Sequence, residues 1–170
     1  WTMGALAGLA RFNRPVDCSS EYVWLVRAAR ALGETWVAEK RVMYGITAGF
    51  GVLCDRFISA EETADLQRNI VLSHATSVGE AMPVEEVRAI MLMMIQNSGQ
   101  GYSGTRLETV EMIRQCLKLG PTPLVPRCGT VGYPSVEGNF AGSLLGNGAL
   151  QTIDASATGD ECIYRTVHIA

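Results

Sequence analysis

The sequence contains few of the patterns that would place it in a specialised class of protein. Its two histidines, His74 and His168, and five cysteines without a C-x-x-C pair give little support for a His/Cys metal site. No metal is therefore expected. The net charge of −3 provides no electrostatic basis for binding nucleic acid or an anionic membrane. Charged residues interrupt the apolar stretch at 84–95, so no membrane-spanning helix is expected.

The N-terminus also lacks the basic leader and long apolar core of a secretory signal. It begins with Trp1 rather than Met, which indicates a chain that was cut or is only partly present. Without a cysteine pairing pattern, reduced thiols are expected, and these features favour a cytoplasmic protein. What the sequence does contain is 48% hydrophobic residues with mixed charge, which is typical of a folded domain with a sizeable core.

Helical periodicity predominates along the chain and predicts a mainly α fold with little β structure. It predicts helices over residues 21–42, 59–75, 84–96, 106–120 and 138–150, the first interrupted near Gly33. Capping boxes are expected at Ser59-x-x-Glu62 and Thr105-x-x-Glu108. We expect a domain at 1–150 and an irregular tail at 151–170, in which the alternation over 164–169 fits either a strand or a partly ordered end.

Gly-rich loops separate these helices at residues 44–51, 98–104 and 129–138. Loops of this kind can bring the backbone close to a ligand, or they can simply connect helices. Composition alone leaves both interpretations open.

Three segments, taken in order, resemble the histidine and aromatic amino-acid ammonia-lyases. YGITAGFG (44–51) is similar to the family's Y-G-x-N-T-G-F-G loop, and LQRNIVLSHATSVGE (66–80) to its L-Q-x-N-L-x-x-S-H-x-x-G-V-G-E stretch. GYSGTRLETVEMI and PLVPRCGTVG resemble its G-x-S-G-x-R-x-E-x-V-E and P-x-x-P-x-x-G-S-V-G segments. The resemblance implies the N-terminal helical domain of such a lyase, with the remainder of the site supplied by further sequence, by a second chain or by a homo-oligomer.

The family's electrophile, a methylidene-imidazolone (MIO), forms from consecutive Ala-Ser-Gly after the G-S-V-G. The matching triad here is Tyr133-Pro134-Ser135, whose central proline has no hydroxyl to eliminate. A one-residue slip would place Ser135 at the centre, but the attacking nitrogen would then belong to the β-branched Val136. No MIO cofactor is therefore expected.

The resemblance also implies roles for individual residues. Tyr44 would act as the catalytic acid/base, for which a tyrosine needs a lowered pKa, although it could instead be a packed side chain with one hydrogen-bond partner. Thr47 and Ala48 replace the loop's Asn and Thr, and Gly51 would lie at the substrate.

His74 would lie in the substrate pocket, with Gln67 and Asn69 on the same helix to orient neighbouring groups. A lone histidine on a mostly apolar helix can equally be a hydrogen-bonded core residue.

Two main functions follow from the resemblance. The first is a lyase-like enzyme acting on an amino acid or related small molecule by MIO-independent proton transfer, such as elimination, isomerisation or cyclisation. Tyr44 would be its acid/base, and loop donors would stabilise the developing anion. The second is a non-catalytic or truncated relative that serves as a binding or assembly subunit.

Overall fold

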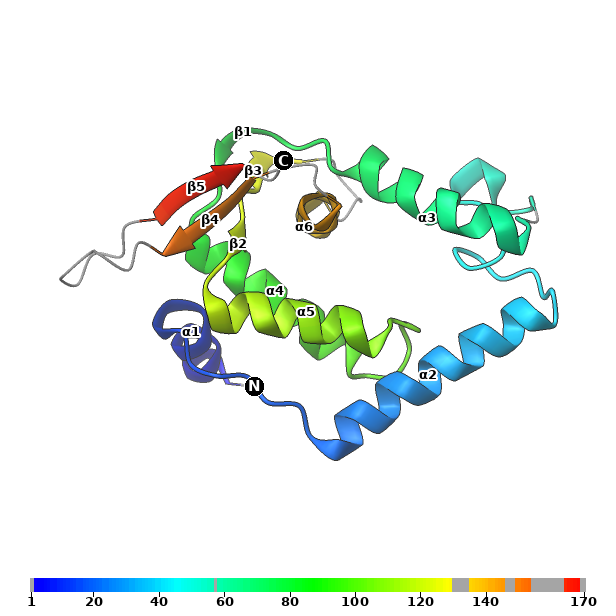
Figure 1. Ribbon diagram of the computed structural model, residues 1–170, viewed down its shortest axis with the longest axis horizontal. Coiled ribbons are helices and arrows are strands. Elements are labelled where there is room, and N and C mark those ends of the chain that lie inside the picture. The colour runs from blue at the N-terminus through cyan, green and yellow to red at the C-terminus, as the bar shows by residue number, and fades with distance from the viewer. Residues whose placement is uncertain (1, 57, 130–134, 146–148, 154–163, 169–170) are drawn as a thin grey trace. The chain divides into compact units, whose positions relative to one another are not determined.

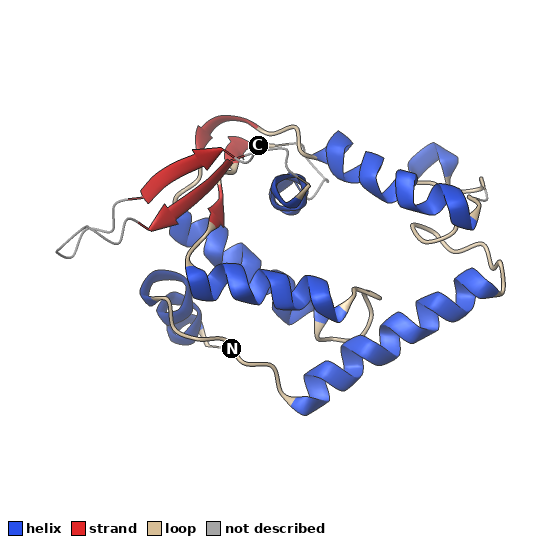
Figure 2. Ribbon diagram, viewed as in Figure 1, coloured by secondary structure: helices blue, strands red, loops and turns tan. Residues whose placement is uncertain are grey.

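The computed structural model describes residues 2–56, 58–129, 135–145, 149–153 and 164–168. Their fold is mainly helical with little β structure, as the sequence predicts (Figures 1 and 2). The described α-helices are α1 (Met3–Phe12), α2 (Ser20–Ala38), α3 (Ala60–His74), α4 (Val84–Ser98), α5 (Leu107–Leu119) and α6 (Ser135–Leu144). The described strands are β1 (Val78–Ala81), β2 (Thr122–Pro123), β3 (Pro126–Cys128), β4 (Ala149–Ile153) and β5 (Tyr164–His168), and Gly51–Leu53 form a 3-10 turn.

The chain divides into two compact units. The first, which we call the strand unit, consists of Trp1–Asp17, Val71–Ile95 and Glu111–Ala170. The second, the α2 unit, consists of Cys18–Ile70 and Gln96–Val110. All the described strands belong to the strand unit. The domain boundary expected at residue 150 stays a prediction.

The core of the strand unit is built largely on α4. Val87, Met91 and Ile95 follow one another at four-residue spacing on one face of this helix, and each is 1% exposed. The buried Arg88 beside them donates from Nε to the Ala10 carbonyl (3.0 Å) and from Nη2 to the Leu117 carbonyl (2.8 Å). These bonds link α1, α4 and α5, and they compensate part of the cost of burying a guanidinium group.

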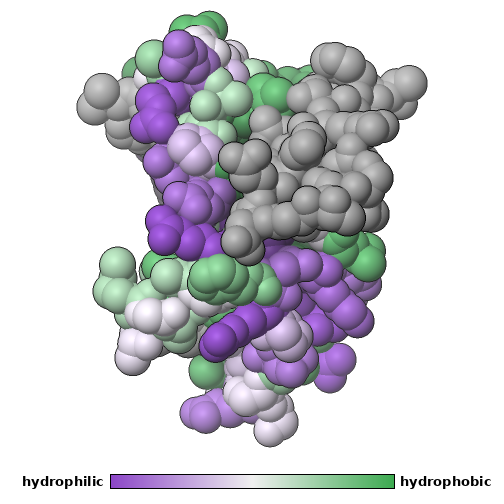
Figure 3. Space-filling model, turned by 90° about the vertical axis from the view of Figure 1, so that its left-hand side faces the viewer, coloured by the Kyte–Doolittle hydropathy of each residue, from purple (hydrophilic) through white to green (hydrophobic). Residues whose placement is uncertain are grey.

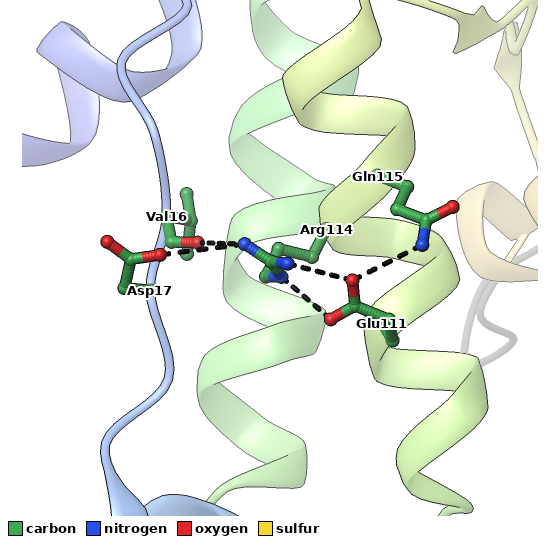
Figure 4. A network of polar contacts seen from close by, with 5 residues as sticks. All are labelled: Val16, Asp17, Glu111, Arg114 and Gln115. Atoms are coloured by element: carbon green, nitrogen blue, oxygen red, sulfur yellow. Dashed lines mark hydrogen bonds and ion pairs between the residues drawn. The ribbon is translucent and has the colours of Figure 1, made fainter.

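A second arginine fixes the segment after α1 to α5 (Figure 4). Arg114 donates to the Val16 carbonyl (3.1 Å) and forms an ion pair with Asp17 (3.5 Å). Its other nitrogens donate to both oxygens of Glu111, at 2.7 and 2.8 Å, while Gln115 also donates to Glu111. The hydrogen bond from Arg114 lowers the pKa of the Glu111 carboxyl.

The strands form two small antiparallel sheets. β1 pairs with β3, with an irregular register between Val78 and Ala81. The other sheet has the order β2-β4-β5, and β4 and β5 pair along their whole length from Ala149↔His168 to Ile153↔Tyr164. The strand interpretation is therefore confirmed for Tyr164–His168.

Local helix signals were reliable where a side chain caps the backbone. Ser59 Oγ accepts from the Glu62 N–H (3.3 Å), and the Glu62 carboxylate accepts from the Ser59 N–H (3.4 Å), so this capping box is confirmed. The interruption expected near Gly33 is wrong, because α2 continues to Ala38. A glycine costs a helix interior only about 1 kcal/mol, which a helix of this length tolerates.

Two other helix starts differ from the prediction. α5 begins at Leu107, one residue after the predicted start, and the Thr105 N–H donates to Ser103 Oγ (3.3 Å), while the capping box at Thr105 stays a prediction. α6 begins at Ser135 and ends at Leu144, earlier at both ends than the predicted helix over 138–150.

The described surface mixes hydrophilic and hydrophobic side chains, as one face shows in Figure 3. Large apolar residues are exposed on both units, among them Met3 of α1 (81% exposed) and Trp24 of α2 (66% exposed). Within the part of the chain that the structure describes, no helix combines the length and apolar character needed to cross a membrane.

Candidate functional site

The loop that carries Tyr44 is a compact turn in the α2 unit. The Met43 carbonyl accepts hydrogen bonds from the N–H groups of Ile46, Thr47 and Ala48 at 3.0–3.1 Å. Further on, the Gly49 N–H donates to the Arg56 carbonyl at 3.2 Å. The backbone of this segment, residues 41–56, therefore folds on itself, and we call it the Tyr44 loop.

Thr47 holds the centre of the Tyr44 loop together. Its side chain is 2% exposed, and its hydroxyl accepts from the Met43 N–H (2.9 Å) and donates to the Arg41 carbonyl. Its own carbonyl accepts from the Ile58 N–H at 2.9 Å. Where the family motif has Asn, threonine thus supplies both a donor and an acceptor to the backbone on either side.

The Tyr44 side chain is presented at the surface of this loop. It is 63% exposed, and its ring meets the Phe50 ring edge-on with 5.4 Å between centroids. The Tyr44 hydroxyl accepts a hydrogen bond from the Gly51 N–H at 3.4 Å. Gly51 adopts a φ of 56° and Gly45 a φ of 73°, conformations that favour glycine. The two glycines therefore set the turn that brings the Gly51 N–H to the phenol oxygen.

Gln67 and Asn69, two of the candidate site residues on α3, differ in their surroundings. The Gln67 side-chain amide donates to the Gly45 carbonyl at 3.4 Å and so joins α3 to the Tyr44 loop. Asn69 lies exposed on the same helix. The structure therefore brings Tyr44, Gly51 and Gln67 into one local cluster of the α2 unit.

His74 belongs to a second cluster, in the strand unit. It is the last residue of α3, partly buried, and its Nδ1 lies 2.9 Å from Ser73 Oγ. α6 packs directly against it, because a Cβ added to Gly138 would lie 3.0 Å from the carbonyl carbon, Cβ and carbonyl oxygen of His74. Asn139 of α6 also donates to Ser77 Oγ at 2.8 Å.

This contact between α6 and residues 74–77, which we call the α6 contact, was missed from the sequence. The only available signal was a glycine inside an apolar segment after the triad, and composition gave it no partner. Of the triad itself, Tyr133 and Pro134 lie outside the described residues, while the Ser135 backbone begins α6.

Other titrating groups lie away from these clusters. Burial, with the nearby Cys18, raises the pKa of Tyr22 to about 12, and burial also raises the pKa of the Cys116 thiol. Over the described residues, no group of three or more His, Cys, Asp or Glu side chains is placed to hold a metal ion.

The family model for aromatic amino acid lyases matches residues 1–166, nearly the whole chain. The chain belongs to this family. Among curated relatives, it is 40% identical over 131 residues to a histidine ammonia-lyase of Streptococcus gordonii and 44% identical over 131 residues to that of Symbiobacterium thermophilum. Each of these alignments covers 77% of this chain and 26% of the relative. The chain thus spans about a quarter of the length of the curated lyases it matches.

Solved structures of the lyase family share the fold. The histidine ammonia-lyase of Trypanosoma cruzi superposes with a TM-score of 0.81 at 30% identity, over 89% of this chain and 30% of that one. The ergothioneine-degrading ergothionase of Treponema denticola superposes with a TM-score of 0.83 at 23% identity, over 96% of this chain and 32% of that one. The second match bears on the fold alone. The resemblance inferred from the ordered motifs is therefore confirmed.

Proposed function

We propose that this chain forms part of the active site of a lyase-like enzyme that acts on an amino acid or a related small molecule without an MIO group. The observation that carries the proposal is the position of Tyr44, a largely exposed phenol whose oxygen is held by the Gly51 N–H at 3.4 Å. The histidine ammonia-lyases that the chain resembles supply the class of substrate.

The triad chemistry argues against MIO in this chain. Ring closure needs a backbone nitrogen that can attack, and the methylidene needs a central hydroxyl that leaves as water. Pro134 offers no hydroxyl, and Ser135 replaces the glycine whose nitrogen attacks in the family. The Ser135 backbone is moreover the first residue of α6. The residues present do not fit the group, so the proposed reaction uses none.

The proposed chemistry is a proton transfer at Tyr44. Acting as the base, the Tyr44 phenol oxygen takes the proton from a substrate carbon, the electron pair of the broken C–H bond forms a carbon–carbon double bond, and the group on the neighbouring carbon leaves with its own bonding pair. Since no electrophile activates an amine, the leaving group must already be activated. The Gly51 N–H donates to the phenol oxygen and fixes its position for the transfer.

His74 remains a proposed substrate-binding residue, with its Nδ1 2.9 Å from Ser73 Oγ. Asn69, exposed on α3, remains a proposed binding residue, and Gln67 a residue that positions the Tyr44 loop through Gly45. The remaining substrate contacts would come from further sequence or from a second copy of the chain.

Replacement of Tyr44 tests the proposal directly. General acid–base catalysis typically contributes a factor of about 10²–10⁴, so Tyr44→Phe should lower turnover by at least about 100-fold. The assay would follow the absorbance of a new conjugated double bond over a panel of amino acids and derivatives with activated leaving groups. Tyr102→Phe is the matched control, because Tyr102 is 93% exposed and lies in a different loop of the same unit.

Retention of wild-type turnover in Tyr44→Phe would contradict the role of Tyr44. The alternative function is a non-catalytic binding or assembly subunit, and the altered triad is the observation that favours it. Saturable substrate binding by wild-type protein without turnover of any panel member would support this alternative instead.

A further inference from the structure

A cavity of about 560 Å³ lies in the α2 unit, and none of the candidate catalytic residues lines it. Charged side chains dominate its lining: Arg27, Arg30 and Glu34 from α2, Arg106 from the residue just before α5, and Glu108 from its first turn. Volumes of about 300–1,000 Å³ are typical of sites for small molecules. The cavity is therefore large enough for an organic ligand.

Glycines in the loop before α5 allow this loop to pack closely against α2, and these two segments form the walls of the cavity. The loop before α5 packs on α2 so closely that a Cβ on Gly99 would lie 2.0 Å from the Tyr22 ring. One on Gly101, whose φ is 78°, would lie 3.3 Å from Leu25 Cδ2. Tyr22 and Leu25 are one turn apart on α2. This close packing fixes the loop along the helix and places Arg106 beside the arginines of the next turns.

The arginines that line the cavity outnumber its acidic residues. Arg30 pairs with Glu34 on its own helix, with 2.8 Å between Nε and Oε1. Among the described residues, neither Arg27 nor Arg106 has an ion-pair partner. Glu108 is the only other acidic residue in the lining. The lining thus carries one more positive than negative charge, with two guanidinium groups available to a ligand.

We propose that this cavity binds a small organic anion through carboxylate or phosphate groups held by Arg27 and Arg106. A guanidinium group presents a planar fork of donors that matches the two oxygens of a carboxylate or phosphate. Two arginines that face one cavity repel each other, and an anion between them removes that repulsion. The site is independent of the proposed reaction at Tyr44, so it would exist whether or not the chain is catalytic.

Arg106 is also the arginine of the G-x-S-G-x-R pattern, for which helix capping offered a structural explanation. A cap formed by Thr105 and Glu108 would account for those two residues but not for the arginine between them. Anion binding would explain the arginine at this position, because the loop before α5 places Arg106 in the lining of the cavity.

Calorimetric titration with two probes tests the proposal. Succinate and inorganic phosphate would each be added to the protein at a constant ionic strength set with chloride, so that a general screening effect does not imitate binding. We expect saturable one-to-one binding of at least one probe. The probe that binds more tightly identifies the oxyanion that the site prefers.

Arg27→Gln and Arg106→Gln should each weaken this binding at least about tenfold, as expected when a charge-assisted bidentate contact is lost. Arg68→Gln is the matched control, since Arg68 is an exposed arginine of α3 in the same unit that does not line the cavity. Its affinity should equal that of wild type.

Three results would overturn the proposal: no saturable binding of either probe, equal weakening in the Arg68→Gln control, or unchanged affinity in both cavity variants. Nuclear magnetic resonance on the wild type gives a readout that does not depend on the variants folding. The Nε–H signals of Arg27 and Arg106 should move on titration, and fixed signals during saturable binding would place the ligand elsewhere.

Discussion

The Tyr44 loop matches a family motif and α6 directly follows another in the sequence, yet the replacements at these two places act in opposite ways. In the Tyr44 loop, Thr47 replaces an asparagine but still bonds the backbone on both sides. In the sequence just before α6, Pro134 stands where the family has the serine whose hydroxyl is eliminated. The first change keeps the atoms that the loop needs, whereas the second removes the atoms that the family's chemistry needs.

The proposed function implies that the fold and the chemistry of this family can separate. α6 still packs so closely on His74 that a Cβ added to Gly138 would lie 3.0 Å from it, although the sequence before this helix has Tyr133-Pro134-Ser135 where the family has Ala-Ser-Gly. Packing depends on the size of a residue at a contact, and several sequences satisfy it. Ring formation depends on a particular hydroxyl and a particular nitrogen, and few sequences supply both.

The largest stability effect should come from the Tyr44 loop. Thr47→Val keeps the shape of the side chain but leaves the Met43 N–H and the Arg41 carbonyl without their partner. We expect the free energy of unfolding to fall by about 2–3 kcal/mol, measured by urea denaturation. Thr109→Val, on the exposed face of α5, is the control and should change it by less than about 0.5 kcal/mol. Equal effects of the two changes would show that Thr47 does not organise the loop.

Adding a single methyl group at Gly138, in the α6 contact, should lower the free energy of unfolding. Gly138→Ala places a Cβ 3.0 Å from His74 backbone and side-chain atoms, so one helix must move away from the other. We expect destabilisation of about 1–2 kcal/mol by the same measurement.

Gly33→Ala is the matched control, because nothing lies within 4 Å of the added Cβ in mid-helix α2. It should stabilise the protein by about 0.5–1 kcal/mol through helix propensity. The two alanines should thus act with opposite signs, and the same sign for both would contradict the close packing of α6 on His74.

The smallest effect concerns a residue outside both regions. Because burial raises the pKa of Tyr22 from 10.0 to about 12, the folded state holds the phenol proton more tightly than the unfolded state does. Its contribution to stability is complete below pH 10 and is lost as the pH rises toward 12. Urea midpoints should fall over this range in the wild type and less steeply in Tyr22→Phe. Identical pH slopes in the two proteins would show that Tyr22 titrates normally.

Local signals predicted the parts of the fold that are decided within a few residues. Ser59 and Glu62 fix the start of α3 by their own hydrogen bonds, and Gly120 ends α5 with a φ of 100°. The break expected at Gly33 failed, because helix continuity depends on the summed preferences of a long segment rather than on one weak residue.

The candidate site was predictable only in part, and through the family motifs. They indicated Tyr44 and Gly51, which the structure joins by a hydrogen bond. They gave no indication of Gly138, whose importance lies in a contact with a residue 64 positions earlier in the sequence. Nor did they indicate that Arg27 and Arg106 line one cavity, since that depends on how a loop packs on α2.

Intact-protein mass spectrometry tests most directly the claim that this chain keeps the Tyr44 loop but not the family's electrophile. We expect a mass equal to that of the unmodified sequence and no absorbance from a conjugated imidazolone. A mass lower by two water molecules, together with that absorbance, would contradict it.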